Sequence, residues 1–234
     1  MDNRFSRLEI LIGEDNFNKL TSAHVAVFGI GGVGGYTVEA LVRSGINKIS
    51  IIDYDTVSLT NLNRQIIALE NTIGRKKVDV MEERILAINN QCQVNKYDMM
   101  YLKETADKID LSKFDYVIDA VDNISAKLEL IERCYYQKIP IISCMGTGNK
   151  LDPSLLEITD IYKTSVCPLA KVMRRELKKK NIKKQKVLYS KEYPIKPAKS
   201  DEETMKREVI GSTSFVPSSA GLLIASYVVR ELIK

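Results

Sequence analysis

The chain has 234 residues, of which 44% are hydrophobic and 28% are charged, and its formal net charge is +5. This composition supports a hydrophobic core and excludes a disordered tail protein, a collagen-like fibre and a disulfide-framed miniprotein. The length predicts one large domain, or one domain with an appended lobe. Residues 171–186 contain nine Lys or Arg residues and one acid, a net +8, so the rest of the chain sums to −3. The sequence therefore predicts a mildly acidic body with one concentrated basic element.

The four cysteines, Cys92, Cys134, Cys144 and Cys167, form no C-x-x-C pair. Their spacing argues against a zinc ribbon, a redox dithiol and a secreted disulfide scaffold. The first residues lack the apolar run that a signal peptide contains. The longest apolar stretch, 220–229, is shorter than the roughly 20 residues that span a bilayer. We therefore expect a soluble, cytoplasmic protein without a membrane span.

Apolar runs and helical spacings alternate along the first 150 residues. The predicted strands are residues 24–28, 48–53, 93–97, 114–121 and 139–143. The predicted helices between them are residues 36–44, 75–88 and 125–137. This alternation predicts an α/β fold with a doubly wound, Rossmann-like and mostly parallel sheet.

Past Cys144 the alternation stops, and the sequence predicts a small C-terminal extension. A further strand is expected at 155–161, and Pro168 begins a basic helix. A mobile loop is expected at 190–212 and a final apolar helix at 218–233. We therefore divide the chain into a Rossmann-like core, residues 1–150, and an extension packed on it, residues 151–234.

A glycine-rich run follows the first predicted strand and precedes the first of these helices. Its glycines are Gly29, Gly31, Gly32 and Gly34. Glycine at these points lets backbone amides approach a phosphate at the positive end of the helix. Asp53 ends the second strand, where it is placed to accept hydrogen bonds from ribose hydroxyls. The pattern predicts a binding site for an adenine nucleotide but does not distinguish NAD from ATP. The alternative is a tight strand-to-helix turn that binds no ligand.

Charged and amide side chains follow the strands that should carry this nucleotide. They are Asp55, Asn61, Asn63, Arg64, Gln65, Lys77, Asp122 and Asn123. Ligands of open α/β sheets bind outside the carboxyl ends of the strands. Arg and Lys neutralise charge that develops on a triphosphate and Asp holds Mg²⁺, whereas hydride transfer needs no such set. The set as a whole therefore favours binding of ATP with Mg²⁺. For any single residue of the set, the alternative is a charged side chain on a loop that contacts only solvent.

These motifs resemble the ThiF and ubiquitin-activating-type adenylyltransferases over residues 4 to about 150. The matching residues are the glycine run, Asp53, Asn61-Leu62-Asn63-Arg64-Gln65, Lys77 and Val117-Ile118-Asp119-Ala120-Val121-Asp122-Asn123. The resemblance implies that Asp53 binds ribose and that Asn61, Arg64 and Lys77 bind the triphosphate. It further implies that Asp122 holds the catalytic Mg²⁺. The core would then be an ATP-binding adenylation domain.

The N-terminal Arg4-Phe5-Ser6-Arg7 is similar to the R-x-x-R of this family. The resemblance implies that Arg7 reaches the phosphates of a neighbouring subunit, and hence that the protein is a homodimer. The candidate catalytic residues are thus Arg7, Arg64, Lys77 and Asp122. The alternative for Arg7 is a surface arginine on a frayed terminus.

Differences from the family pattern indicate which branch of the family the chain resembles. Sulfur-carrier adenylyltransferases usually hold zinc with two C-x-x-C pairs, which this chain lacks. The chain instead resembles the tRNA threonylcarbamoyladenosine dehydratase branch over nearly its whole length. The resemblance is carried by the short length of the chain, by the basic helix, by Lys150-Leu151-Asp152-Pro153 and by the ending Phe215 to Gly221. That resemblance implies ATP-dependent adenylation of the carboxylate of threonylcarbamoyladenosine in the tRNA anticodon loop, then cyclising dehydration, without zinc. A sulfur-transfer protein is a further candidate partner.

Such a reaction needs no protein thiolate, because the attacking group belongs to the same nucleoside and ring closure is intramolecular. Cys144 and Cys167 are therefore interpreted as structural residues, with a nucleophilic role as the alternative. His24, the only histidine, begins a buried strand and is also interpreted as structural.

The basic element predicts contact with RNA phosphates. Its candidate tRNA-binding residues are Lys171, Arg174, Arg175, Lys178, Lys179, Lys180, Lys183 and Lys184. A solvated charged face is the plainer alternative. Two other functions stay open: adenylation of a ubiquitin-like sulfur-carrier protein, and an NAD(P)-dependent oxidoreductase or non-catalytic nucleotide sensor.

Overall fold

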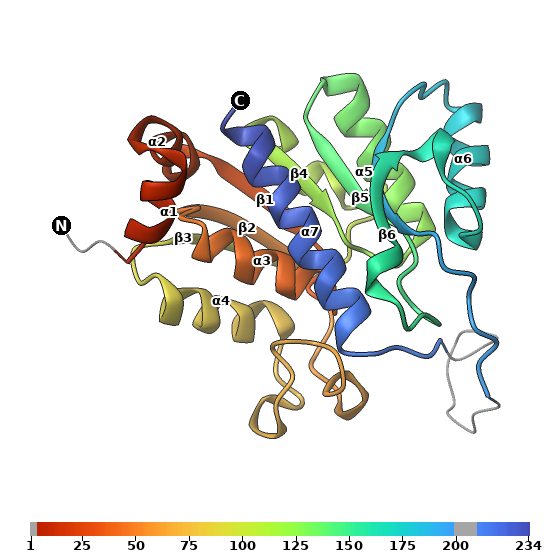
Figure 1. The fold of residues 1–234 in the computed structure, drawn as a ribbon, viewed down its shortest axis with the longest axis horizontal. Helices are drawn as coiled ribbons and strands as arrows, with labels where there is room; N and C mark the ends of the chain where they lie inside the picture. The colour runs from red at the N-terminus through yellow and green to blue at the C-terminus, as the bar shows by residue number, and fades with distance from the viewer. Residues whose placement is uncertain (1–3, 199–209) are drawn as a thin grey trace.

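The computed structural model describes residues 4–198 and 210–234, which form a seven-stranded sheet flanked by helices (Figure 1). The strand order is β3-β2-β1-β4-β5-β7-β6, parallel throughout except for the antiparallel pair β6 and β7. The strands are β1 (His24–Phe28), β2 (Lys48–Asp53), β3 (Gln93–Asp98), β4 (Tyr116–Asp119), β5 (Ile141–Cys144), β6 (Leu156–Asp160) and β7 (Lys186–Ser190). The predicted Rossmann-like, mostly parallel sheet is confirmed. Strand order reverses between β1 and β4, where open sheets of this kind bind ligands.

Helices cover both faces of the sheet. They are α1 (Ser6–Ile12), α2 (Glu14–Ser22), α3 (Gly34–Arg43), α4 (Lys77–Ile88), α5 (Ile124–Gln137), α6 (Pro168–Lys179) and α7 (Phe215–Leu232). On one face α3, α4 and α7 pack against the strands, and on the other face α5 does. Of the helices in the described ranges, none is long and apolar enough to cross a membrane.

Burial on both faces explains why β1 is a continuous apolar run. Val25 and Val27 pack into the cluster with α3, α4 and α7, whereas Ala26 and Phe28 face α5. All five residues of β1 are buried. A strand covered on both sides is therefore apolar at most positions, and the alternation of a half-exposed strand is lost.

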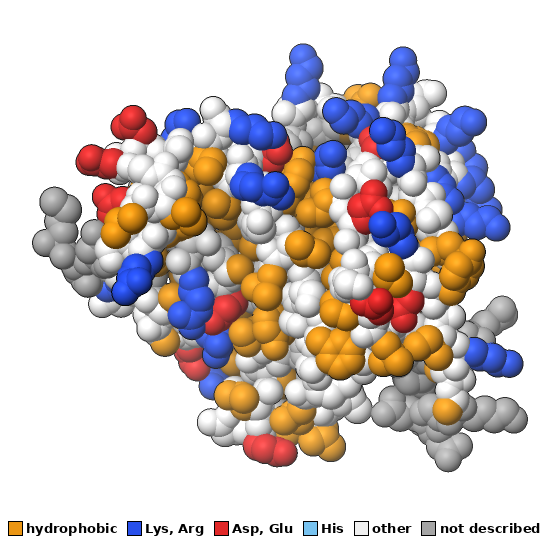
Figure 2. Space-filling view, viewed as in Figure 1, with side chains coloured by type: hydrophobic (Ala, Val, Ile, Leu, Met, Phe, Trp, Pro, Cys, Tyr) orange, Lys and Arg blue, Asp and Glu red, His pale blue; other side chains and the backbone are white. Residues whose placement is uncertain are grey.

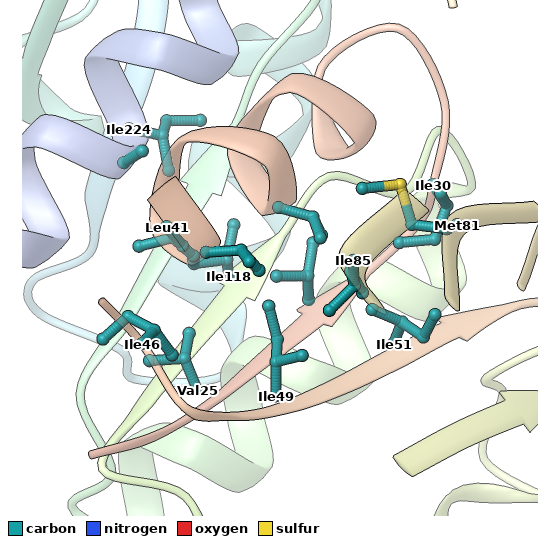
Figure 3. Close-up of a cluster of buried hydrophobic side chains, with 14 of the residues drawn as sticks. Val25, Ile30, Leu41, Ile46, Ile49, Ile51, Met81, Ile85, Ile118 and Ile224 are labelled. Carbon is teal, nitrogen blue, oxygen red and sulfur yellow. The ribbon is translucent and has the colours of Figure 1, made fainter. Parts of the chain in front are cut away.

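The larger core cluster joins residues that are far apart in the sequence. Figure 3 shows Val25 of β1, Ile49 and Ile51 of β2, Leu41 of α3 and Ile224 of α7 in this cluster. All five are fully buried. Each such side chain contributes about 1.5–3 kcal/mol through removal from water.

The C-terminal helix α7 crosses α3 at close range. A Cβ atom added to Gly221 would lie 2.4 Å from the main-chain oxygen of Val33. At this crossing the Thr37 hydroxyl donates to the main-chain oxygen of Gly221 at 3.2 Å. The predicted final helix is therefore present, and this crossing places the start of α7 beside the glycine run.

Three elements were not identified from the sequence. They are α1, α2 and β7. The basic element at 171–186 runs from α6, which ends at Lys179, through a connection to Lys186, the first residue of β7. That strand exists because it pairs with β5 and β6, both distant in sequence. Of the predicted mobile loop, residues 199–209 lie outside the described residues.

Candidate active site

A cleft of about 330 Å³ lies at the carboxyl ends of β1, β2 and β4. It brings together most of the residues predicted to bind the nucleotide. Those that line it are Gly29, Gly31, Gly32, Asp53, Asp55, Asn61, Arg64, Gln65, Lys77, Asp122 and Asn123. Gly34 and Asn63 do not line it: Gly34 lies in the first turn of α3, and the Asn63 amide donates to the main-chain oxygen of Ser212 at 3.1 Å.

The glycine run forms one wall of the cleft and leads into α3. Gly29 has φ +89°, and a Cβ atom on it would lie 2.7 Å from the main-chain oxygen of Ala120. A Cβ atom on Gly34 would lie 1.8 Å from the main-chain oxygen of Gly29. The backbone therefore doubles back tightly, so that Gly31, Gly32 and Val33, which immediately precede α3, border the cleft. Amides at a helix N-terminus lack intrahelical partners and attract anions.

Asp53 is buried at the end of β2 and fixes the start of the glycine run. Its carboxylate accepts from the Ile30 amide at 2.6 Å and from the Asp55 amide at 2.8 Å. Burial raises the pKa of Asp53 above its ordinary value, while nearby Lys77 acts in the opposite direction. A carboxylate has about four acceptor sites. Asp53 can therefore hold the loop and still accept from a ribose hydroxyl.

Two basic side chains and an amide, Lys77, Arg64 and Gln65, also line the cleft. The Lys77 ammonium lies 2.9 Å from Asp55 Oδ2, and the Lys77 side chain is only 6% exposed. Arg64 Nη1 donates to the main-chain oxygen of Thr60 at 2.7 Å. Gln65 Oε1 is buried and has no hydrogen-bond partner among the described residues. A buried amide oxygen without a partner is costly, and a donor from a ligand would satisfy it.

The turn after β4 closes the cleft. Asp122 is exposed and lines the cleft, and Asn123 follows it. Asn123 Oδ1 accepts from the Ala126 amide at 3.0 Å, so Asn123 also caps α5. This capping bond anchors the turn that presents Asp122.

Several cleft residues were missed from the sequence. Ile52, Met99, Met100 and Tyr101 form an apolar part of the lining. The last three directly follow β3, so the strand-end rule could have indicated them. Thr147, Ser212 and Pro217, which were also missed, come from the C-terminal half and have no local signal.

The cysteines lie in the interior. Cys144 and Cys167 are 4% and 2% exposed, and neither lines the cleft. Burial raises the pKa of Cys144 to about 12, so its thiol is protonated at neutral pH. His24 donates or accepts a hydrogen bond with Ser50 at 2.9 Å, inside the sheet. These positions agree with structural roles.

The basic element is divided between α6 and the connection that follows it. Figure 2 shows blue side chains gathered at the right-hand edge, where Figure 1 places α6. Arg174 donates to Thr164, and Lys180 pairs with Glu132. Arg175 and Lys179 both pair with Glu176. The exposed residues that form no ion pair with the described residues are Lys171, Lys178, Lys183 and Lys184.

The match to known proteins decides the family. The sequence profile of the ThiF family matches residues 5–234. The chain belongs to the ThiF family. Among ThiF-related proteins, the tRNA threonylcarbamoyladenosine dehydratase of Bacillus subtilis (strain 168) is 43% identical over 100% of this chain and 96% of its own.

A solved structure extends this likeness to three dimensions. The tRNA N6-threonylcarbamoyladenosine dehydratase of E. coli in complex with ATP superimposes with a TM-score of 0.89 at 33% identity, covering 98% of this chain and 93% of that one. A different ThiF-related protein, the adenylyltransferase and sulfurtransferase MOCS3 of Culex quinquefasciatus, is 37% identical but covers 65% of this chain and 34% of its own.

Proposed function

We propose that this chain is an ATP-dependent tRNA threonylcarbamoyladenosine dehydratase. ATP activates the carboxylate of threonylcarbamoyladenosine in tRNA, and the nucleoside then closes its ring with loss of water. The observation that carries the proposal is the full-length match to a dehydratase, joined to a cleft in which Arg64, Lys77 and Asp122 come together.

The cleft suits this chemistry. A carboxylate loses its oxygen only when that oxygen becomes a better leaving group than hydroxide, and an acyl-AMP provides one. We propose that Asp53 accepts from ribose and that the loop that leads into α3, with Gly31 and Gly32, binds the phosphates. Arg64 and Lys77 offset the charge that develops as pyrophosphate leaves. Ring closure is intramolecular, so it needs no attacking group from the protein.

Mg²⁺ fits this donor set, with Asp122 as its protein ligand. Of the carboxylates that line the cleft, Asp53 is buried and Asp55 is half-buried, whereas Asp122 is exposed. The described residues contain no group of three or more His, Cys, Asp or Glu that could hold a metal. Mg²⁺ commonly binds through one or two carboxylates plus substrate phosphates and water. Bound there, it would neutralise phosphate charge.

The alternatives have less support. A sulfur-carrier adenylyltransferase would share the ATP cleft, but the match to such a protein covers 65% of this chain rather than all of it. An NAD(P)-dependent oxidoreductase would not require Arg64, Lys77 and Asp122 around phosphates.

The deciding experiment is mass spectrometry of anticodon-loop nucleosides. The protein is incubated with ATP, Mg²⁺ and tRNA that carries the linear nucleoside, and the product should be lighter by one water. An unchanged mass with folded protein would overturn the proposal. Pyrophosphate exchange driven by a ubiquitin-like protein, and unaffected by tRNA, would favour the sulfur-carrier alternative.

We further propose that the enzyme is a homodimer in which Arg7 acts on the partner's nucleotide. Arg7 is exposed on α1 and does not line the cleft of its own chain. On the same helix Ile10 and Leu11 are 82% and 79% exposed, which is unusual for a helix of a monomer. Both features are accounted for if α1 lies against a second copy.

Mixed dimers test this arrangement. Arg7→Ala and Asp122→Ala should each lower activity strongly when alone. A mixed dimer then holds one complete site, so an equal mixture should recover about a quarter of wild-type activity. Activity is measured after the subunits are unfolded and refolded together. Recovery that stays at the sum of the separate variants would show that Arg7 does not act across an interface.

The exposed lysines of the basic element are proposed to contact the tRNA backbone. Lys171 and Lys178 are seven residues apart and share a face of α6 with Arg175. The helix begins beside the cleft, because Leu169 approaches Gly146 and Thr147 lines the cleft. At about 1.5 Å per residue, the 12 residues of α6 span about 18 Å. The stem of the tRNA would lie along it while the loop enters the cleft.

Charge reversal tests this surface. Lys171, Lys178 and Lys183 changed together to Glu should raise the Kd for tRNA more than about tenfold and reduce its log–log salt slope by about 3. ATP affinity should not change. The matched control reverses Lys48, Lys103 and Lys108, three exposed lysines outside the basic element. Equal losses in both triple variants would assign the effect to net charge and not to this surface.

A further inference from the structure

A buried ion pair lies directly behind the turn that carries Asp122. Lys127 Nζ donates to Asp119 Oδ1 at 3.0 Å and to the main-chain oxygen of Cys144 at 2.7 Å. The two side chains are 1% and 0% exposed. Neither residue lines the cleft, and neither was predicted from the sequence to have a role.

Stability alone is a weak explanation for this pair. Removing two charges from water costs a desolvation free energy that offsets much of their electrostatic attraction. A protein with an apolar pair of similar volume at such a site is often as stable or more stable. The cost is increased here because Asp119 Oδ2 is buried without a hydrogen-bond partner among the described residues. A buried pair that is kept despite this cost suggests a positional role.

The pair is connected to the cleft through the backbone of the turn. Asp119 Oδ1 also accepts from the Val121 amide at 3.2 Å. On one side of the turn Ala120 packs against Gly29, and on the other side Asn123 caps α5. Asp122 therefore lies between anchored residues, and the bond from Val121 is the one that depends on the orientation of Asp119.

Lys127 joins three elements at this point. It belongs to α5, pairs with the last residue of β4 and donates to the last residue of β5. Its two acceptors hold the ammonium group, and the ammonium group in turn holds Asp119 Oδ1 in the position that accepts from Val121. Without it, Asp119 is a buried carboxylate with no cation beside it, and it must rotate or admit water.

We propose that Lys127 is a positioning residue: it orients Asp119, which holds the turn at 120–122 so that Asp122 faces the phosphates of the bound nucleotide. The proposal rests on the function proposed for Asp122. Lys127 itself touches neither nucleotide nor substrate.

Hydrogen exchange tests the positioning directly. In Lys127→Met, exchange of the Val121 amide should accelerate at least tenfold, while exchange of the β1 amides stays unchanged. Lys127→Arg should restore part of the protection because it keeps a cation beside Asp119. The result does not depend on which reaction the protein catalyses, so it separates this proposal from the proposed function. Unaltered exchange at Val121 would overturn the positioning.

Kinetics test the consequence for the reaction. Lys127→Met should lower kcat at least thirtyfold per folded molecule, with the Kd for ATP within threefold. In an Asp122→Asn background the same change should cause no further loss. Arg84→Met, which removes a cation from the partly buried Glu39 away from the cleft, is the matched control and should leave kcat within threefold.

A neutral double variant distinguishes positioning from stability. Asp119→Asn with Lys127→Met removes both charges and should restore the thermal midpoint. If the pair served stability alone, kcat would recover together with the midpoint. The positioning role predicts that kcat stays at least tenfold below wild type, because nothing orients the side chain at position 119.

Discussion

Asp122→Asn should lower kcat about 10²–10³-fold and leave the Kd for ATP within about threefold. Asp122 lines the cleft at the end of β4, where the phosphates of a bound nucleotide are expected. The substitution keeps the size of the side chain and removes its charge. Loss of a charge that acts mainly as pyrophosphate leaves should therefore affect kcat far more than binding.

The measurement combines single-turnover formation of the dehydrated nucleoside with ATP binding by calorimetry. Glu104→Gln is the matched control, since it removes one exposed carboxylate that does not line the cleft. Its kcat and Kd should equal those of the wild type. If Asp122→Asn turned over normally, the assignment of Mg²⁺ to Asp122 would be wrong.

Gly34→Ala should abolish nucleotide binding and destabilise the protein by about 3 kcal/mol, which corresponds to a fall in Tm of about 6–12 °C. In an ordinary helix, alanine is about 1 kcal/mol more favourable than glycine. Here the sign reverses because the new Cβ atom would lie 1.8 Å from the main-chain oxygen of Gly29. The glycine run must move, and the amides proposed to bind the phosphates move with it.

Gly31→Ala provides a control within the same run. The nearest atom to its added Cβ, the side-chain nitrogen of Gln65, is 4.0 Å away. Its Tm should stay within about 2 °C of the wild type, so any loss of ATP affinity would come from the cleft itself. Thermal unfolding with and without ATP and Mg²⁺ measures both variants. A Gly34→Ala protein as stable as Gly31→Ala would contradict the close approach.

The strands β1, β2, β4 and β5 and the glycine run could be predicted because their signals are local, whereas β3 is a mostly exposed edge strand with a weaker signal. Strands buried on both faces read as continuous apolar runs, and the turns between them are marked by glycine and polar residues. Asp53 was predicted for a similar reason, since its position at the end of β2 follows from the strand itself. The strand-end rule then places Asp55 and Asp122 at the same edge of the sheet.

Other parts of the site depend on contacts between distant residues. Pro217 and Ser212 enter the cleft because α7 packs across α3 at Gly221, and the sequence near them carries no nucleotide-binding pattern. Similarly, β7 is a strand because β5 and β6 supply its hydrogen-bond partners. Pairing of this kind is decided by the whole fold and not by local propensity.

The basic element could be identified from the sequence alone, because the positions of Lys and Arg along the chain show where the net charge of +5 is concentrated. Which of its side chains are exposed and without an ion pair depended on the tertiary structure, since Glu132 and Glu176 pair with Lys180, Arg175 and Lys179. The buried pair of Lys127 and Asp119 is a further example. A lysine eight residues after an aspartate has no special meaning in sequence, and the pair forms only because α5 packs its first turns over the ends of β4 and β5.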